Sequence, residues 1–510
     1  MPFSNTYNIA TDCIDKHQRT NISRNKTAMI HVLEQEGTIS AKKWTFDDFY
    51  KATNAMASYL LSKGLKPKER VVLRLDNSPD FIVAFLGAIK MGAIPIPTSI
   101  MLKPAELDFI FKDSQASGLI TTKDVWSHDV GPVVFMDEIR FSSFAPFLVL
   151  PTLMEDPAYW LYTSGTEGQP KGVIHAHRSI LAHDERVLRW QSFQENDVVF
   201  NTSALNWSYA LTGGLLDIWR FGGTSLVYNG SCRPDLLKKI VDEFGVSIFM
   251  SVPGIYRRLA DYLEKDDSGF EPVRVCLCAG EKLPGEVREK FIKVTGTDIY
   301  EGLGMTEHSV YLVQPYGERI RDGSCGRPLF GTRIAILDEQ LNELGPDCEG
   351  ILASHKSCMG LMLGYHDAVG AGVSRPGFMG DWFLSGDVAR YDEEGNFYFL
   401  GRRDDLITAG GYRISPLEVE AVLNTCPDVL ESAVVGATLK EGKTIVKAYL
   451  VLKCMGQGNC TPTEKCVQSI LDYAAQNLAK YKVPRDIVFV SELPKTHNGK
   501  IVRKTLTTNN

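Results

Sequence analysis

The sequence lacks a long apolar run, a clustered cysteine pattern and an excess of basic residues, and each absence excludes a class of protein. No apolar stretch reaches the roughly 18 residues of a membrane-spanning helix; the longest obvious one, Phe81 to Ile89, ends at Lys90. The segment Met1 to Thr20 has no apolar signal-peptide core. The eleven cysteines form no CxxC pair, so we expect reduced thiols, no metal held by cysteine and histidine, and a cytoplasmic location. The net charge of −7 gives no indication of nucleic-acid binding.

The length of the chain predicts more than one domain. Its 510 residues exceed the roughly 250–300 at which one core usually splits. Strand-like and helix-like segments alternate, as in Arg70 to Leu75 followed by Asp80 to Met91, which favours layered α/β subdomains with largely parallel strands. From about Gly331, short strands between turn residues predict a small β-rich subdomain. We place the domain boundary at Asp404, giving a large N-terminal lobe (1–403) and a small, mobile α+β C-terminal lobe (404–510).

The segment Tyr162 to Gly172 has the composition of a phosphate-binding loop. Its glycines allow backbone N–H groups to approach phosphate oxygens, its hydroxyls can donate, and the ammonium of Lys171 neutralises charge. Pro170 and Gly172 flank the lysine where a Walker A motif requires Gly and Ser or Thr, which argues against a GTPase-like P-loop protein. An ordinary surface loop has the same composition. The candidate phosphate contacts are Thr163, Ser164, Gly165, Thr166, Gly168 and Lys171.

Five further motifs follow this loop, and each has an ordinary structural interpretation when taken alone. Gly302 and Gly304 lack the third glycine of a dinucleotide fingerprint. Glu307 is compatible with a carboxylate at a helix start, Asp387 with a turn aspartate, and Lys500 with a solvated tail lysine. The motifs are Ala279 to Pro284, Tyr300 to Glu307, Ser385 to Ala389 with Gly401 to Asp405, Ala409 to Ile414, and Leu493 to Arg503.

Taken together and in this order, these segments closely resemble the adenylate-forming enzymes. That superfamily contains acyl-CoA synthetases, peptide-synthetase adenylation domains and luciferases, and the resemblance covers most of residues 160–505. It implies that ATP binds here, with Thr306 donating to the α-phosphate, Glu307 holding Mg²⁺ and Lys171 neutralising phosphate charge. Lys500 would be the catalytic lysine at the substrate carboxylate and the α-phosphate. Further implied nucleotide contacts are Gly280, Glu281, Lys282, Glu301, Gly302, Leu303, Asp387 at both ribose hydroxyls, and Arg402 at the ribose or phosphate.

The resemblance also implies a moving C-terminal lobe that serves the second half-reaction. Asp404 matches the hinge about which this lobe rotates. The loop that follows would swing in to form the coenzyme A tunnel, through Gly410, Gly411, Tyr412 and Arg413. Two positions depart from the family pattern. Glu167 replaces a small hydroxylated residue, which puts one phosphate contact in doubt, and Asn498 stands where Ser or Thr often precedes the Gly-Lys pair.

Residues 206–211, which precede the motif Ala279 to Pro284, belong to a candidate acyl pocket. Residues 206–211 contain no aspartate to hold the ammonium of an amino acid, so we expect an aryl or aliphatic acid. Residues 249–256 and the overall length look similar to benzoate-CoA ligases and their medium-chain relatives. Trp207 and Tyr209 are equally compatible with ordinary core aromatics. The pocket residues predicted from the resemblance are Asn206, Trp207, Tyr209, Ala210, Gly304 and His308.

The predicted function is an AMP- and pyrophosphate-forming acyl- or aryl-CoA ligase. Gly-x-Ser-x-Gly does not occur and no enzyme nucleophile is required, so His175 and His177 are expected to shape the turn after the loop. No carrier segment follows Lys504, which favours free coenzyme A as the acceptor. Two alternatives stay open: an enzyme that loads a separate carrier protein, and a non-catalytic adenylate-binding regulator. The expected partners are a small carboxylic acid, ATP and coenzyme A, without nucleic acid or membrane, in a monomer or homodimer.

Overall fold

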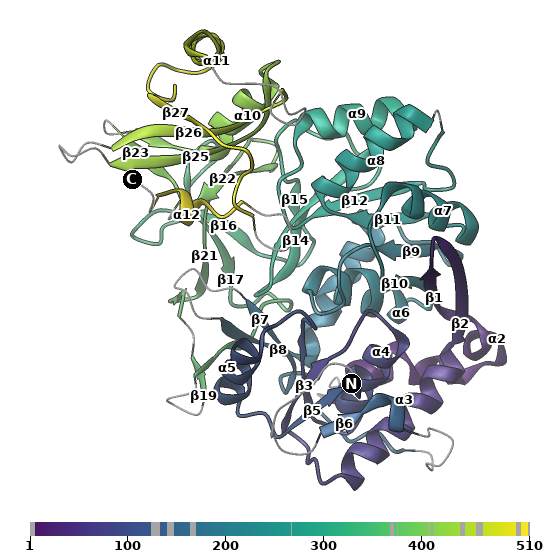
Figure 1. Cartoon of the computed structure of the whole chain (residues 1–510). Helices are drawn as coiled ribbons and strands as arrows, with labels where there is room; N and C mark the ends of the chain where they lie inside the picture. Colours follow the sequence, from purple (N-terminus) through teal and green to yellow (C-terminus); the bar gives the residue numbers. More distant parts are fainter. Residues whose placement is uncertain are drawn as a thin grey trace.

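The structure is a computed structural model with a large N-terminal part and a small C-terminal part (Figure 1). The predicted fold class, layered α/β subdomains followed by an α+β lobe, is confirmed. The boundary at Asp404 stays a prediction, since that residue lies outside the described ones. The structure describes residues 6–123, 133–139, 147–163, 170–266, 268–367, 372–374, 376–403, 405–409, 412–438, 444–454, 463–495 and 501–507.

A nine-stranded sheet forms the centre of the N-terminal part. Its six inner strands run parallel, as the alternating pattern predicts, and an antiparallel strand or hairpin closes each edge. Cys276 and Cys278 share one face, which α7 (Pro234–Phe244), α8 (Pro253–Asp266) and α9 (Gly285–Thr295) cover. The strand order is β15 (Arg327–Pro328), β14 (Ser309–Val313), β13 (Ile299–Met305), β12 (Val275–Ala279), β11 (Ile248–Ser251), β9 (Val198–Asn201), β10 (Thr224–Tyr228), β1 (Thr27–Gln35) and β2 (Thr38–Thr45).

The opposite face of this sheet shares its core with a second, four-stranded parallel sheet. Every residue of helix α4 (Pro79–Lys90) except Asp80 is buried, because its sequence is mostly apolar, and α3 (Phe46–Ser62) packs beside it. The fully buried ammonium of Lys90 lies 2.5 Å from Asp15, which ties the N-terminal segment to this helix. The strand order is β4 (Ile94–Thr98), β3 (Arg70–Arg74), β5 (Gly118–Thr121) and β6 (Val133–Phe135), with α5 (Pro104–Ser114) between β4 and β5.

Two antiparallel sheets complete the N-terminal part. One runs in the order β19 (Gly372–Ser374), β18 (Gly364–Asp367), β8 (Lys171–Ala176) and β7 (Pro157–Thr163), so it joins strands far apart in the sequence. This antiparallel sheet was not expected, because the sequence predicts largely parallel strands. The other confirms the predicted β-rich subdomain and contains β16 (Ile334–Leu337), β17 (Gly350–His355), β21 (Trp382–Tyr391), β20 (Phe378–Met379) and β22 (Phe397–Arg402).

The C-terminal part is a small α+β unit beside β22 (Figure 1). Helix α10 (Pro416–Thr425) begins as predicted at Ser415, whose hydroxyl accepts the Glu418 N–H and donates to the Leu400 carbonyl of β22. The helix packs on a three-stranded sheet through Val419 and Leu423. The other elements are β23 (Ile407–Ala409), β24 (Tyr412–Ile414), β25 (Val429–Thr438), β26 (Thr444–Leu452), α11 (Glu464–Asn477), β27 (Asp486–Phe489) and α12 (Arg503–Thr507).

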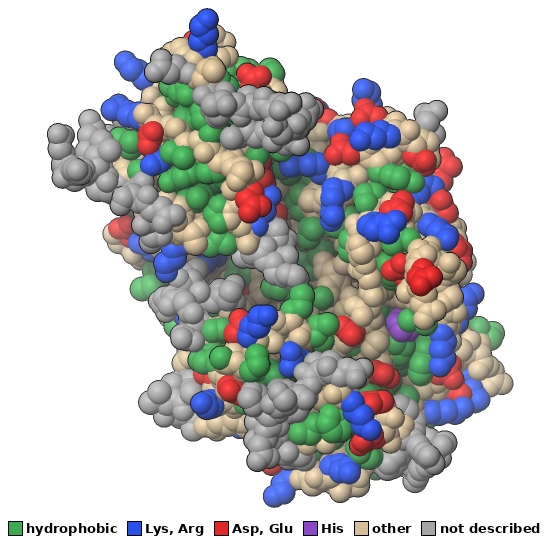
Figure 2. Space-filling model, viewed as in Figure 1, with side chains coloured by type: hydrophobic (Ala, Val, Ile, Leu, Met, Phe, Trp, Pro, Cys, Tyr) green, Lys and Arg blue, Asp and Glu red, His purple; other side chains and the backbone are tan. Residues whose placement is uncertain are grey.

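The surface and the helices add two observations. Lys and Arg side chains are interspersed with Asp and Glu on the face that Figure 2 shows, as expected for a net charge of −7. Within the described ranges, no helix is both long and apolar enough to span a membrane.

Candidate functional site

The candidate phosphate loop connects the two strands of an antiparallel hairpin. Thr163, the last residue of β7, pairs with Lys171, the first residue of β8, so the strands fix both ends of the loop. A Walker A loop instead joins a strand to a helix, and the topology agrees with the exclusion made from the sequence. Ser164, Gly165, Thr166 and Gly168 lie outside the described residues.

Strand β18 brings a tyrosine between Lys171 and Glu307, the two charged residues that the motifs single out. The Tyr365 hydroxyl donates a hydrogen bond of 2.7 Å to Oε1 of Glu307. The ammonium of Lys171 lies over the same ring, 5.9 Å from its centroid. Burial, followed by the charge of Glu307, raises the pKa of Tyr365, which therefore stays a hydrogen-bond donor. Tyr365 was not predicted from the sequence, because an aromatic residue in a short strand carries no signal of function.

Thr306 and Glu307 lie in the tight turn between β13 and β14. The His308 N–H donates to Met305 O at 3.2 Å, and Ser309 follows with a φ of +58°. Glu307 therefore does not lie at a helix start, and that structural alternative is wrong. The backbone carbonyl of Glu307 accepts the Met362 N–H at 2.8 Å, which attaches the turn to the segment leading into β18.

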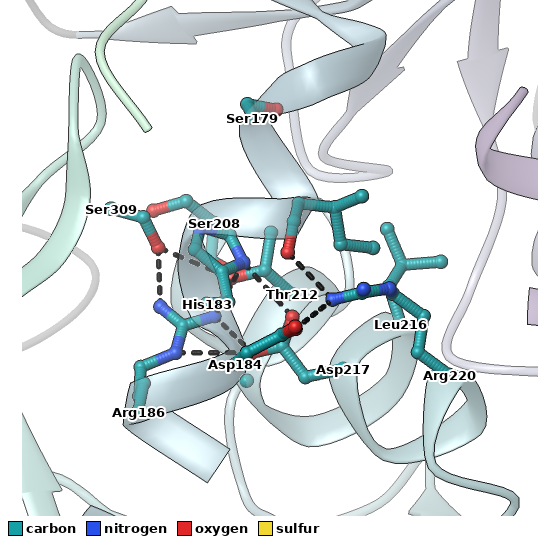
Figure 3. A network of polar contacts seen from close by, with 12 residues as sticks. Ser179, His183, Asp184, Arg186, Ser208, Thr212, Leu216, Asp217, Arg220 and Ser309 are labelled. Atoms are coloured by element: carbon teal, nitrogen blue, oxygen red, sulfur yellow. Dashed lines mark hydrogen bonds and ion pairs between the residues drawn. The ribbon is translucent and has the colours of Figure 1, made fainter. Parts of the chain in front are cut away.

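A buried network of charged and polar side chains contacts this turn at Ser309 (Figure 3). Arg186 donates to the Ser309 hydroxyl at 2.6 Å and to Asp217 through two nitrogens. The Nδ1 atom of His183 lies 2.9 Å from the other carboxylate oxygen of Asp217, and Thr212 accepts a further bond from Arg186 at 3.1 Å. The network thus joins the turn to the segments 183–190 and 209–217. No sequence signal marked it, since its members lie in no motif.

The electrostatics of this network follow from burial and pairing. Burial opposes the ionisation of Asp217, but the charge of Arg186 outweighs it, and the pKa of the carboxyl lies below its usual value. Burial and Arg186 together lower the pKa of His183. Burial also lowers the pKa of His175 to about 3 and that of His177 to about 4. Both imidazoles are thus neutral and withdrawn from solvent, in agreement with a role in shaping the turn.

Asp387 and Arg402 form a pair across neighbouring strands. They lie opposite each other in β21 and β22, and Arg402 donates to Asp387 at 2.8 Å. Burial opposes the charge of Arg402, but Asp387 and Glu307 raise its pKa, so the guanidinium lies within electrostatic range of both carboxylates. The structure thereby brings Asp387 and Arg402 near Glu307, although Glu307 belongs to a different motif.

The turn after β12 is held by Glu301 of β13. Its carboxylate accepts the Leu283 N–H at 3.1 Å, and its backbone N–H donates to Gln314 at 2.7 Å. Burial raises the pKa of Glu301 to about 7, although Lys282 partly opposes the effect. Gly280 has a φ of +95°, a left-handed conformation that favours glycine, so the turn geometry itself requires this residue.

The candidate acyl pocket includes a π-helical segment, residues Tyr209–Leu216. Such segments occur often at functional sites. The Tyr209 ring packs 6.2 Å from Trp190, and its hydroxyl donates to Leu277 O at 3.2 Å, whereas Trp207 is 44% exposed. A Cβ on Gly302 would lie 2.7 Å from Trp190, so the absence of a side chain at position 302 leaves room for that ring.

The remaining pocket residues differ in their surroundings. Ala210 is buried, and Asn206 is half-buried. A Cβ on Gly304 would lie 2.4 Å from Ser309 O, so close pairing of β13 and β14 requires glycine there. His308 stacks on Tyr311 at 4.8 Å, and its Nδ1 lies 2.9 Å from the Ser354 hydroxyl. Its ring is therefore directed towards β17, and its pocket role stays a prediction.

The C-terminal site residues lie largely outside the described part of the chain. This holds for Asp404, Gly410, Gly411 and Lys500. Tyr412 and Arg413 belong to β24, which pairs with β23. Their roles at the coenzyme A tunnel stay predictions.

Comparisons with known proteins agree with the motifs. The model of the AMP-binding enzyme family matches residues 17–366, and that of the AMP-binding enzyme C-terminal domain matches residues 418–500. The chain is 30% identical to acyl-coenzyme A synthetase ACSM5 of Homo sapiens, covering 98% of this chain and 90% of the relative. It is 30% identical to benzoate–CoA ligase of Thauera aromatica, covering 91% and 90%.

A solved structure supports the same assignment. The anthranilate CoA ligase AuaEII in complex with anthranoyl-AMP superposes with a TM-score of 0.86 at 27% identity, covering 99% of this chain and 97% of that one. The predicted resemblance to adenylate-forming enzymes is thereby confirmed, and the solved structure covers 99% of the chain. From its motifs, its fold and these matches, the chain belongs to the AMP-binding enzyme family.

Proposed function

We propose that this protein is an AMP-forming acyl-CoA ligase that activates an aryl or aliphatic carboxylic acid. The convergence of Lys171 and Glu307 on Tyr365 carries the proposal, because a cation and a carboxylate face one region at the exit of the phosphate loop. Arg402 acts electrostatically on Glu307 from the neighbouring β21–β22 pair. The relatives named for benzoate and acyl substrates support the same reaction class.

The donor set near Glu307 suits a magnesium ion that is bound together with phosphates. In the described part of the chain no three His, Cys, Asp or Glu side chains form a metal cluster. Mg²⁺ at a nucleotide site usually takes one or two carboxylates and completes its shell with phosphate oxygens and water. A single carboxylate at Glu307 fits that pattern. When bound there, Mg²⁺ would neutralise charge on the phosphates.

The first half-reaction joins the acid to AMP. A carboxylate oxygen of the substrate attacks the α-phosphorus of ATP, the bond to the β-phosphate oxygen breaks, and pyrophosphate leaves. Lys171 stabilises the developing negative charge, and Thr306 donates to the α-phosphate. Lys500 supplies a second cation from the C-terminal lobe, a role that rests on its motif. Asp387 accepts from the ribose hydroxyls and thereby orients the nucleotide.

The second half-reaction transfers the acyl group to a thiol. The coenzyme A sulfur attacks the acyl carbon of the mixed anhydride, the carbon–oxygen bond to AMP breaks, and the thiol proton passes to solvent. We assign the tunnel for the thiol to the loop of Gly410 and Gly411 after rotation of the C-terminal lobe about Asp404. No enzyme nucleophile takes part in either step.

The candidate acyl pocket favours an uncharged acyl group. The polar groups of the π-helical segment are engaged within the protein: the Tyr209 hydroxyl bonds to Leu277 O, and the Thr212 hydroxyl bonds to Ser208 O. Asp217, the nearest acid along the chain, is fully buried and paired with Arg186. The ammonium of an amino-acid substrate would therefore find no carboxylate partner among the described residues 204–217.

Carboxylate-dependent ATP–pyrophosphate exchange tests the proposal across benzoates, short- to medium-chain fatty acids and amino acids, followed by addition of coenzyme A. We expect exchange with an aryl or aliphatic acid and its conversion to AMP and an acyl-CoA. Exchange without thioester formation would favour a carrier protein as the acceptor. AMP binding without exchange would favour the non-catalytic regulator.

A pair of variants separates the two half-reactions. Lys500→Ala should abolish adenylation but retain thioester formation from preformed acyl-AMP. Gly411→Leu should block thioester formation but retain pyrophosphate exchange. Equal loss of both activities in Lys500→Ala would contradict the role given to this lysine.

A further inference from the structure

Tyr365 contacts two residues on which the proposed function depends, although it belongs to none of the motifs. Its hydroxyl lies 2.7 Å from Glu307 Oε1, and its ring centroid lies 5.9 Å from the ammonium of Lys171. The two partners lie on different elements, the β13–β14 turn and the start of β8. One side chain therefore joins the candidate metal ligand to the lysine of the phosphate loop.

The backbone around Tyr365 is attached to both partners. In β18, Tyr365 pairs with Val173 of β8, and the Leu363 N–H donates to Ile174 O at 2.8 Å. The Met362 N–H donates to Glu307 O at 2.8 Å. The Tyr365 backbone cannot shift far without breaking these bonds, and the hydrogen bond to Glu307 then orients the phenol.

The geometry has a chemical consequence for Glu307. A phenol donates one hydrogen bond, and a carboxylate can accept about four, so the contact at Oε1 leaves Oε2 available to a cation. The bond restricts rotation of the carboxylate and so reduces the entropy lost when it binds a metal. The electron-rich face of the ring also favours the ammonium of Lys171.

We propose that Tyr365 is a positioning residue that orients Glu307 for the magnesium–nucleotide complex and stabilises Lys171 beside the phosphate loop. This inference rests on the proposed function, since it assigns Mg²⁺ and nucleotide phosphates to these two side chains. Residues that orient a metal ligand typically change metal affinity 10–100-fold when they are altered. Tyr365 makes one such contact to a single carboxylate, so we expect a change near about tenfold.

Two variants separate the hydroxyl from the ring. Tyr365→Phe keeps the ring under Lys171 and removes only the donor to Glu307, whereas Tyr365→Leu removes both. Calorimetric titration with ATP, without any acid substrate, is performed once with Mg²⁺ and once with EDTA. We expect Tyr365→Phe to bind Mg-ATP about tenfold more weakly and metal-free ATP unchanged, and Tyr365→Leu to weaken both. Tyr316→Phe, at a 37% exposed tyrosine, is the matched control.

The outcomes distinguish positioning from a general structural role. If Tyr365→Phe lost ATP affinity equally in Mg²⁺ and in EDTA, or lost none in either buffer, the inference would be overturned. A Glu307→Gln background provides a second measurement. In that background, Tyr365→Phe should no longer alter the difference in ATP affinity between Mg²⁺ and EDTA. If the unaltered protein binds no nucleotide in either buffer, the proposed function itself fails, and this inference fails with it.

Discussion

The raised pKa of Glu301 predicts a stability that depends on pH in one direction. The folded protein retains the proton up to about pH 7, whereas the unfolded chain releases it near 4.5. Between these values the folded state binds more protons, so the free energy of unfolding falls as pH rises and is lowest above pH 7. Glu301→Gln is neutral at every pH and keeps an oxygen for the Leu283 N–H. We therefore expect this variant to gain stability over the unaltered protein as pH rises.

The expected magnitude follows from the two pKa values. The interval from 4.5 to 7, at about 1.4 kcal/mol per pKa unit, gives about 3 kcal/mol. Glu301 is only 8% exposed, so solvent screening reduces this value little. An unfolding entropy of about 2.1 cal/mol/K per residue over roughly 400 residues converts 3 kcal/mol into about 4 °C of Tm.

Calorimetric melting of the ligand-free protein at pH 5 and pH 8 measures this effect. Only the part of this change that falls between pH 5 and pH 8 is measured, about 2.5 kcal/mol, so the Tm of Glu301→Gln relative to the unaltered protein should rise by about 3 °C between the two values. Glu349→Gln, at an exposed glutamate, is the matched control and should show no such rise. Parallel Tm profiles for Glu301→Gln and the unaltered protein would refute the reasoning, because Glu301 would then be ionised throughout.

Two further predictions concern the support of the site. Asp217→Asn leaves the buried guanidinium of Arg186 without its counter-ion and should cost about 3–5 kcal/mol, seen as a lower Tm; an unchanged Tm would contradict the network. Gly326→Ala should destabilise strongly in thermal melts, because its φ is +90° and a Cβ would lie 1.8 Å from Val313 O. Gly323→Ala, with a φ of +72° and open space around its Cβ, should cost only about 1–2 kcal/mol, and equal losses would show that the close approach is unimportant.

Most local elements could be predicted from the sequence, because their signals are local. The strand at Arg70 and the buried helix before Gly92 follow from apolar runs that end in turn residues. The N-cap at Ser415 follows from the serine–proline pair at the helix start. In each case the residues that determine the element are also the residues that form it.

The features that could not be predicted from the sequence depend on contacts between distant segments. The pairing of Tyr365 with Val173 joins two strands that lie far apart in the sequence. The bond from Arg186 to Ser309 likewise spans more than a hundred residues. Neither residue type is unusual in its local context, so periodicity and motif spacing could not reveal these partners.

The hydroxyl of Ser415 bears on the proposed rotation of the C-terminal part. It is a direct link from α10 to β22, through the Leu400 carbonyl. β22 itself is held by Arg402 on Asp387 and by the Arg403 N–H on Gly386 O at 2.8 Å. Breaking the hydrogen bond between the Ser415 hydroxyl and the Leu400 carbonyl costs about 1 kcal/mol, which is of the order of thermal energy. In the proposed rotation of the C-terminal part, this weak contact would break at little cost, and the bound nucleotide or thiol would then decide which orientation is populated.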